Sequence, residues 1–229
     1  TFPATANAVY MSGAKVVLVD VDTQTLNMDT KDLIKKINKN TKAIMYVHYA
    51  SFFSKRNEIV DLLQKSNIRL IEDAAHSFGC YYPNGKLLGD NFDIVCFSFD
   101  GIKNITTGEG GAIISEDPLI LEHVKNARLL GVKNDSKARF KKERTWDLDV
   151  DIQGWRYHMS DINAAIGRVQ LKKIERFKFL RQNLSECYLS EINSRHVSFL
   201  DIDYQKIIPH IFPILLSSEN KRNQLQQVL

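Results

Sequence analysis

The sequence predicts an α/β fold in which a mostly parallel sheet lies between two layers of helices. Short runs rich in β-branched residues alternate with amphipathic segments along most of the 229 residues. Such alternation is typical of parallel sheets covered on both faces. Polar side chains follow two of the predicted strands, and in sheets of this kind ligands bind beyond the carboxyl ends of strands. The same pattern therefore predicts both the fold class and the place of a binding site.

Hydrophobic periodicity and capping residues set the expected elements in order. Gly13 is placed to end the first helix, because glycine tolerates the left-handed backbone of a helix C-terminus. Asp29 and Ser160 can cap later helices with their side-chain oxygens. We expect helices over residues 4–12, 29–37, 57–64, 119–130, 161–175 and 177–192, and a helix-like stretch over residues 220–229. We expect strands over residues 15–21, 43–48, 68–72, 93–99, 111–115 and 210–216.

The chain is expected to comprise one large domain and the beginning of a smaller one. Residues 1–175 carry the alternating pattern of the large domain. Residues 176–229 are predicted to begin a small α+β domain whose first strand is residues 210–216. The chain starts at Thr1 rather than at Met and ends in a helix-like stretch. We therefore expect a fragment that lacks both ends of a longer protein, including the N-terminal part of the large domain.

Composition and charge argue against several classes of protein. Hydrophobic residues make up 44% of the chain and charged residues 25%, which is ordinary for a globular protein. The net charge is only +4. The richest basic cluster, residues 137–144, falls in a predicted long polar loop at residues 133–151, so we expect no nucleic-acid partner. No apolar run approaches the length of a membrane span and no signal peptide is visible, so we expect a cytoplasmic protein without a membrane partner.

The cysteines indicate a reducing compartment. Cys80, Cys96 and Cys187 are scattered, odd in number and without a CxxC pair. Disulfide frameworks and zinc sites both need closely patterned cysteines, and this sequence has none. The sequence therefore predicts no metal site.

The most informative stretch is residues 94–114, where a lysine lies in a turn between two apolar runs. Ser98 ends the first run, Lys103 follows five residues later, and Gly108, Gly110 and Gly111 precede the second run. Most lysines are solvated surface residues. A lysine enclosed by apolar walls instead has a lowered pKa and a nucleophilic amine. We therefore predict that Lys103 attacks a carbonyl carbon and carries a Schiff base.

A second informative stretch is residues 71–79, where Asp73 ends a predicted strand and His76 follows three residues later. An acidic residue at this position can simply cap a helix. Beside a buried lysine, it also suggests pyridoxal phosphate (PLP), whose aldehyde needs a lysine and whose ring nitrogen needs a carboxylate. The small pair Ala74-Ala75 would let a planar ring lie close to the backbone. His76 could hydrogen-bond the ring's phenolic oxygen, or it could be a histidine satisfied beneath the sheet.

Taken in order, several motifs resemble the DegT-type nucleotide-sugar aminotransferases, a family of PLP enzymes of fold type I. The resemblance runs through nearly the whole chain. Any one motif is weakly specific, whereas all of them in this order are highly specific. The motifs are residues 1–7, 13–22, 47–48, 72–76, 97–104, 108–111 and 154–165. The family's Gly-Thr-x-Ala turn, which binds phosphate at a helix N-terminus, would lie upstream of Thr1.

The resemblance implies a role for each residue of the two stretches. Lys103 would form the Schiff base with PLP and then move the proton between the substrate carbon and the cofactor. Asp73 would pair with the ring nitrogen, and His76 would lie near the ring oxygen. Ser98 would donate a hydrogen bond to the phosphate, and its alternative is a hydroxyl that faces solvent.

Two further residues are assigned to the site by the resemblance. Phe2 falls where the family often has an aromatic side chain stacked on the cofactor ring, and packing in the core is the alternative. Arg156 falls where Asn is common, in a segment that reaches the neighbouring subunit's site in the family's dimer. An arginine there could contact a phosphate bidentately, or it could be a surface residue. A homodimer with its active site at the interface is therefore expected.

The resemblance implies an aminotransferase that moves an amino group, with L-glutamate the expected donor, to a nucleotide-linked keto-deoxysugar. The product would be an amino sugar for a surface polysaccharide or a glycosylated metabolite. One alternative is a PLP-dependent nucleotide-sugar dehydratase, but that branch has a histidine in place of the lysine, so Lys103 argues against it. Another alternative is an inactive, truncated homologue that acts as a binding subunit. The retention of Asp73, Ser98 and Lys103 argues against decay of the site.

Overall fold

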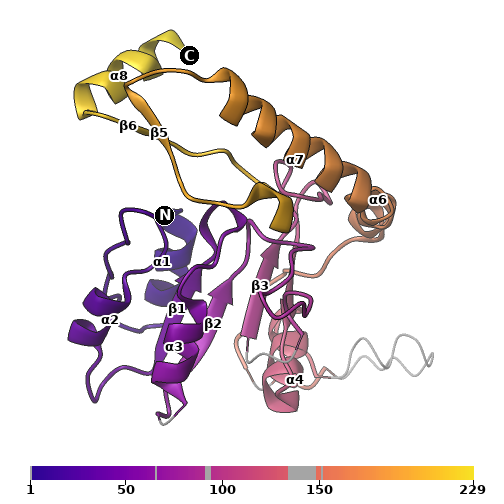
Figure 1. The fold of residues 1–229 in the computed structure, drawn as a ribbon. Coiled ribbons are helices and arrows are strands. Elements are labelled where there is room, and N and C mark those ends of the chain that lie inside the picture. The colour runs from indigo at the N-terminus through magenta and orange to yellow at the C-terminus, as the bar shows by residue number, and fades with distance from the viewer. Residues whose placement is uncertain (1, 65, 91–93, 134–147, 151) are drawn as a thin grey trace.

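The computed structural model describes residues 2–64, 66–90, 94–133, 148–150 and 152–229. A large α/β unit contains a four-stranded sheet, and a smaller C-terminal unit extends from it on a long helix (Figure 1). The helices up to Leu171 are α1 (Pro3–Met11), α2 (Thr30–Lys36), α3 (Arg56–Leu63), α4 (Pro118–Ala127) and α6 (Asp161–Leu171), with the short helix η1 (Tyr49–Ser51). The strands are β1 (Ala43–Val47), β2 (Arg69–Asp73), β3 (Ile94–Ser98) and β4 (Gly111–Ile114).

The sheet is mostly parallel, as the sequence predicts. Its strands follow the order β1-β2-β3-β4. β1, β2 and β3 are parallel, with Val47 opposite Asp73 and Asp73 opposite Cys96. β4 returns antiparallel to β3, with Ser98 opposite Gly111. Because parallel strands end at the same edge, Asp73 and Ser98 lie at one edge of the sheet.

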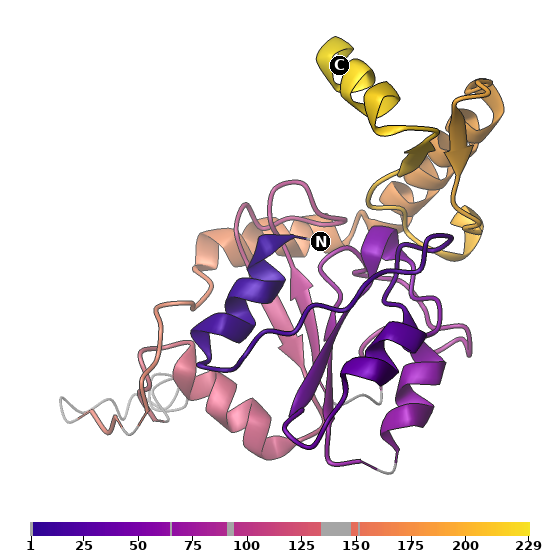
Figure 2. The same ribbon diagram turned by 90° about the vertical axis from the view of Figure 1, so that its left-hand side faces the viewer.

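Helices cover both faces of the sheet. Figure 2 shows α1 and α4 on one side and α2 and α3 on the other. The Asp29 side chain accepts hydrogen bonds from the backbone N–H groups of Lys31 and Asp32 at the start of α2. The Ser160 side chain accepts from the N–H of Asn163 at the start of α6. These caps satisfy donors that lack a partner in the first helical turn. The predicted three-layer arrangement is confirmed.

One contiguous hydrophobic core joins the large unit to the C-terminal unit. Tyr46 on β1, Ile59 on α3 and Val95 on β3 are fully buried in it. Burying a large apolar side chain contributes about 1.5–3 kcal/mol. The two units are therefore held together by packing as well as by chain connection. From the C-terminal unit, the same cluster includes Leu200, Ile202, Tyr204, Ile207 and Ile208.

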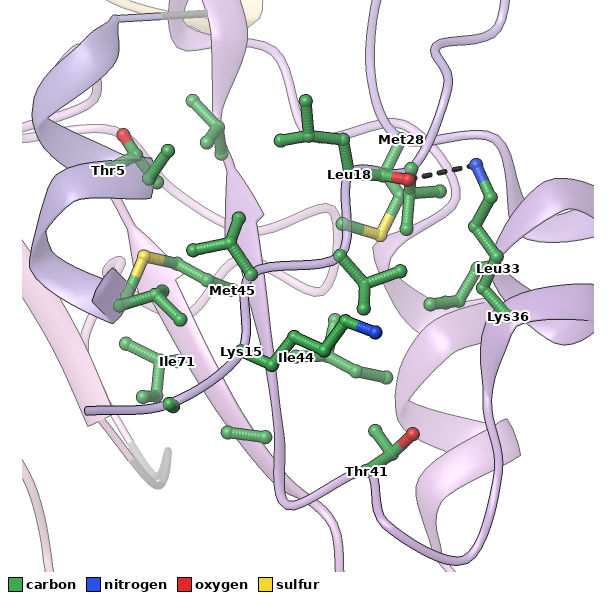
Figure 3. Close-up of a pocket in the computed structure, with 18 of the residues that line it drawn as sticks. Thr5, Lys15, Leu18, Met28, Leu33, Lys36, Thr41, Ile44, Met45 and Ile71 are labelled. Carbon is green, nitrogen blue, oxygen red and sulfur yellow. Dashed lines mark hydrogen bonds between the residues drawn. The ribbon is translucent and has the colours of Figure 1, made fainter. Parts of the chain in front are cut away.

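An apolar groove of about 740 Å³ separates β1 from the extended residues 14–19 (Figure 3). Its lining comes from α1, α2, residues 14–19, β1 and β2, and includes Thr5, Leu18, Met45 and Ile71. Lys36 Nζ donates to the Leu18 carbonyl at 2.8 Å, which fastens the extended residues to α2. The groove therefore lies along the outer edge of β1, which pairs with β2 alone among the described strands.

The predicted strand at residues 15–21 is wrong. Apart from an isolated bridge between Val21 and Met28, these residues form no ladder with other described residues. Their alternation of β-branched residues favours an extended backbone, which they have, but a strand also requires a neighbouring strand to satisfy its N–H and C=O groups. The groove occupies the place where that neighbour would have to lie.

The C-terminal unit consists of α7 (Ile174–Glu191), β5 (Val197–Phe199), the short helix η2 (Tyr204–Lys206), β6 (Ile214–Leu216) and α8 (Glu219–Val228). β5 and β6 form a two-stranded antiparallel sheet. The prediction of a first strand at residues 210–216 is corrected in two respects. The strand covers only Ile214–Leu216, and β5 precedes it. Three residues are too few for a periodic pattern to stand out from the surrounding sequence.

Some predictions fall outside the described residues or stay untested. The long loop at residues 133–151 and its basic cluster at residues 137–144 lie largely outside the described part of the chain. The domain boundary between residues 175 and 176 stays a prediction. Within the described ranges, no helix is both long and apolar enough to span a membrane. The same residues contain no group of three or more His, Cys, Asp or Glu side chains arranged to hold a metal ion.

Candidate active site

Four of the six site residues predicted from the sequence lie at the carboxyl edge of the sheet, which faces the C-terminal unit (Figure 1). Asp73 is the last residue of β2 and Ser98 is the last residue of β3. His76 lies three residues beyond β2, and Lys103 lies in the loop from β3 to β4. The fold thus brings all four residues to one edge, while the role of each stays a prediction.

The carboxylate of Asp73 is held by two neutral donors. Thr5 Oγ1, on α1, donates to Oδ2 at 2.6 Å. The backbone N–H of Ala75 donates to Oδ1 at 3.2 Å. A carboxylate has about four lone-pair sites, so Asp73 retains the capacity to accept a further proton-bearing group.

Lys103 is half-buried in a loop that is closed at its base. The N–H of Phe99 donates to the carbonyl of Gly110 at 2.8 Å, which continues the ladder between β3 and β4 beyond the ends of both strands. Gly108 has a φ of +81°, a backbone conformation that residues other than glycine rarely adopt. The Lys103 side chain acts electrostatically on two histidines, His76 and His210.

Helix α6 supports the same loop from outside. Asn163 Nδ2 donates to the carbonyls of Thr107 and Glu109, at 2.8 and 3.0 Å. The cap residue Ser160 holds Asn163 in turn, through the backbone N–H of Asn163 at 3.2 Å. The C-terminal end of the lysine loop (residues 99–110) is therefore fixed to α6, a helix more than 50 residues further along the chain.

His76 is half-buried and neutral at physiological pH. Its Nδ1 accepts a hydrogen bond from the Ala50 N–H at 3.3 Å, so the ring proton lies on Nε2. Burial and the positive charge of Lys103 lower the pKa of His76 to about 4, and the opposite charge of Asp73 offsets only part of this. A neutral imidazole in this tautomer can donate one hydrogen bond from Nε2.

His210, from the C-terminal unit, packs against His76 with ring centroids 4.3 Å apart. Its Nδ1 is buried and makes no hydrogen bond within the described structure. Arg181 Nη1, on α7, donates to the carbonyls of Pro209 and His210 at 3.0 and 3.2 Å. Burial, the neighbouring His76 and the charge of Lys103 lower the pKa of His210 to about 3.

Asn104 joins the lysine loop to the rest of the site. Its side chain is buried. Its Nδ2 lies within hydrogen-bonding distance of the carbonyls of His76 (3.1 Å), Phe78 (3.2 Å) and Ile208 (3.3 Å). Because Ile208 belongs to the C-terminal unit, one amide connects three segments around the neighbouring Lys103.

A buried ionic cluster lies beneath this edge of the sheet. The Glu72 carboxylate accepts from Arg56 Nε and Nη2, both at 2.7 Å, and lies 2.8 Å from His48 Nε2. The Tyr82 hydroxyl donates to it at 3.1 Å. Burial favours the neutral acid, but the hydrogen bonds from Arg56 and His48 prevail and lower the pKa of Glu72 to about 2. Glu72 precedes Asp73, so the cluster fixes the end of β2.

The remaining two predicted residues lie further out. Phe2 is the N-cap of α1 and is 71% exposed, so it does not pack in the core. It lines one end of the groove together with Thr5. Arg156 is exposed and forms a backbone bridge with Leu129, just beyond α4. The proposed contact of Arg156 with a second subunit's site stays a prediction.

Sequence reasoning assigned no role to Thr5, Asn104 or His210. Thr5 and Asn104 both lie in motifs that carry the family resemblance, but their partners are distant in sequence. His210 opens the apolar run at residues 210–216, for which the sequence predicts a strand. A single histidine at the start of such a run was the only available signal.

Comparisons with known proteins show the family and the fold of the chain. Residues 1–229 match the DegT/DnrJ/EryC1/StrS aminotransferase family. The chain is 37% identical over 224 residues to the UDP-4-amino-4,6-dideoxy-N-acetyl-beta-L-altrosamine transaminase of Campylobacter jejuni, and the match covers 96% of this chain and 57% of that protein. It is 37% identical over 194 residues to the GDP-perosamine synthase of Escherichia coli O157:H7, covering 85% of this chain and 50% of that protein.

A solved structure shows the same fold. PseC of Helicobacter pylori, an aminotransferase involved in the biosynthesis of pseudoaminic acid, matches with a TM-score of 0.86 and 28% sequence identity. The match covers 100% of this chain and 59% of PseC. The chain thus spans a little over half the length of the relatives it matches. With the family match extending over all of its residues, the chain belongs to the DegT/DnrJ/EryC1/StrS aminotransferase family.

Proposed function

We propose that the whole protein is a PLP-dependent aminotransferase that moves an amino group from an amino acid to a nucleotide-linked keto-deoxysugar. The observation that carries the proposal is the convergence of Lys103 and Asp73 on His76. Asp73 ends β2, His76 follows it by three residues, and Lys103 lies in the loop after the parallel strand β3, so all three groups lie at the same edge of the sheet. The charges of Lys103 and Asp73 both influence the pKa of His76. Sites for carbonyl chemistry need such an amine close to a carboxylate.

The residues present fit PLP. Asp73 retains free acceptor capacity for the ring nitrogen, and the Nε2–H of His76 is a donor suited to the phenolic oxygen. Ser98 Oγ accepts from the Asp100 N–H at 3.4 Å, which leaves its hydroxyl hydrogen for a phosphate. Phe2 is exposed beside Thr5 and would stack on the ring, and Arg156 of one subunit would reach the site of another in a homodimer.

PLP, when bound, supplies an aldehyde that takes up amino groups and a ring that withdraws electrons from the adjoining carbon. Lys103 would provide the amine for that aldehyde, and its Nζ would accept and return a proton at the reacting carbon. Asp73 would hold the ring nitrogen protonated. The loop hydrogen bonds of Asn104 and Asn163 would keep Lys103 in place while it does so.

The substrate class comes from the relatives. Two of them are named for UDP-linked and GDP-linked products, a transaminase and a perosamine synthase. We therefore propose a nucleotide-sugar acceptor, L-glutamate as the amino donor, and a cytoplasmic enzyme of amino-sugar biosynthesis.

The test is the Lys103→Ala variant of the full-length protein. We expect loss of the visible absorbance that PLP acquires on a lysine, and loss of amino transfer from glutamate to a panel of nucleotide keto-sugars. Lys39→Ala, at an exposed position, is the matched control and should retain both. Survival of both signals in Lys103→Ala would show that the proposal is wrong.

The dehydratase alternative is separated by the fate of nitrogen. An aminotransferase consumes glutamate in step with product, whereas a dehydratase acts without a stoichiometric amino donor. Measuring glutamate consumption against sugar conversion distinguishes the two. If the full-length protein binds nucleotide sugar but converts none, the binding-subunit alternative is favoured.

A further inference from the structure

In the described part of the chain, His210 of the C-terminal unit packs against the His76 imidazole of the proposed site. The rings lie 4.3 Å apart with an interplanar angle of 40°. Tyr49 also approaches His76, with ring centroids 6.1 Å apart. Among the described residues, the His76 ring accepts one hydrogen bond, from the Ala50 N–H at 3.3 Å, which is long. One weak hydrogen bond leaves the ring orientation to be set by packing.

The position of His210 is fixed by α7 rather than by its own ring. The guanidinium of Arg181 donates to the carbonyls of Pro209 and His210. Arg181 is half-buried, and that burial lowers its pKa. An arginine that is partly desolvated to hold two carbonyls makes a specific tether. Arg181 therefore holds the backbone at His210 against α7, and these hydrogen bonds do not use the imidazole ring.

We propose that His210 is a positioning residue, anchored by Arg181, which holds the His76 imidazole so that its Nε2–H faces the reacting group. This consequence for catalysis rests on the function proposed above, whereas the packing of the two rings does not. The role differs from that of a catalytic residue, because His210 acts through His76.

Burial and the charges around the pair favour the neutral form of both rings and lower the pKa of each. His76 faces the positive Lys103 and the negative Asp73, and His210 faces Lys103, Arg181 and the negative Asp100. Protonating either ring would place a cation against the other imidazole and near Lys103, and burial adds to the cost. A neutral pair keeps the proton of His76 on Nε2 throughout the physiological range. Removing His210 would open the face of His76 to water and make its protonation easier.

The first test uses the full-length protein without added PLP, so that its readout is independent of catalysis. NMR of the histidine side chains reports the tautomer and the pKa of His76. In His210→Ala we expect the pKa of His76 to rise toward the ordinary value of 6.5, because water replaces the packed ring. In His210→Phe, which keeps an apolar ring at the same place, we expect the pKa to stay low.

The second test measures amino transfer with PLP bound. A misplacement of about 1 Å in a catalytic group can cost on the order of 100-fold in rate. We expect His210→Ala to lower kcat by about 10- to 100-fold with little change in KM for the sugar, and His210→Phe to restore most of it. Arg181→Met should resemble His210→Ala, and Arg181→Lys should rescue it in part. Arg176→Ala, an exposed arginine on the same helix, is the control.

The outcomes separate the two proposals. If His210→Ala leaves both the pKa of His76 and kcat unchanged, His210 has no positioning role. If His210→Phe loses as much activity as His210→Ala, packing of a ring is not what matters and the inference is overturned. If Lys103→Ala retains amino transfer, the proposed function fails, yet the NMR comparison still decides whether His210 controls His76.

Discussion

Thr5 donates its hydroxyl hydrogen to Oδ2 of Asp73 across 2.6 Å, joining residues 68 positions apart. The bond fastens the first turn of α1 to the end of β2. It also orients one carboxylate oxygen, while the Ala75 N–H orients the other. A carboxylate held from two sides presents its remaining lone pairs in a fixed direction, as pairing with a ring nitrogen requires.

We predict that Thr5→Val destabilises the protein and weakens its hold on PLP. The nearly isosteric change removes the donor and leaves part of the Asp73 carboxylate without a partner, which costs about 1–3 kcal/mol in unfolding free energy. Thr5→Ser keeps the hydroxyl and should lose far less. Urea denaturation and PLP titration, each compared across the three proteins, check this. Equal losses in both variants would contradict it.

The Glu72 cluster predicts an acid limit to stability. The pKa of Glu72 is about 2 in the folded state against 4.5 for an ordinary glutamate, so the unfolded chain binds the proton first as the pH falls. The stabilisation is complete above about pH 4.5 and is lost between 4.5 and 2. Denaturation midpoints measured across this window should fall with pH, and less steeply in Glu72→Gln.

At neutral pH, the same Glu72→Gln variant should lose about 3–5 kcal/mol in unfolding free energy, because it replaces the buried carboxylate that accepts two hydrogen bonds from the Arg56 guanidinium. Glu122→Gln, at an exposed position on α4, should change stability by less than about 0.5 kcal/mol. A similar effect in both variants would show that the buried cluster contributes little.

Asn104 is predicted to be a structural link as well as a neighbour of Lys103. Asn104→Ala removes the amide group that donates to the carbonyls of His76, Phe78 and Ile208. It should lower the free energy of unfolding by about 1–3 kcal/mol. Asn104→Asp should cost more, because it turns a carboxylate toward those carbonyls. Chemical denaturation ranks the two variants, and the opposite order would contradict the assigned direction of the hydrogen bonds.

The open edge of β1 predicts self-association of the 229-residue chain. An unpaired strand edge beside an apolar groove is a template for pairing with another chain at micromolar to millimolar concentrations. Light scattering should give an apparent molar mass that rises with concentration, and Val17→Lys, in the groove lining, should reduce that rise. Val228→Lys, on exposed α8, is the control and should not. An apparent molar mass of the unchanged chain that does not vary with concentration would contradict the prediction.

Local patterns determined most of what could be predicted from the sequence. Asp29 and Ser160 cap helices because capping depends on a few neighbouring residues, and β1 to β4 were found because each is a short apolar run. Residues 15–21 have the same local pattern, but no described strand lies beside them. Pairing is a property of the fold, so periodicity alone could not reveal its absence.

The candidate site shows the same division. Asp73, Ser98 and Lys103 could be placed together because parallel strands end at one edge. The bonds of Thr5 to Asp73 and of Arg181 to the His210 carbonyl depend on how α1 and α7 dock, which no short motif encodes. The sequence does not reveal a role for His210 for the same reason, because its proposed role depends on its contact with the distant His76 ring.

The hydrogen bond from Phe99 to Gly110 closes the lysine loop beyond the ends of β3 and β4, and Asn163 holds its far side. The two ends of the loop are therefore held by hydrogen bonds that do not involve its exposed residues. Exposed residues within it, such as Ile102, can be exchanged without disturbing the sheet. A substitution at Ile102 is therefore expected to change the surroundings of Lys103 while the sheet keeps its structure.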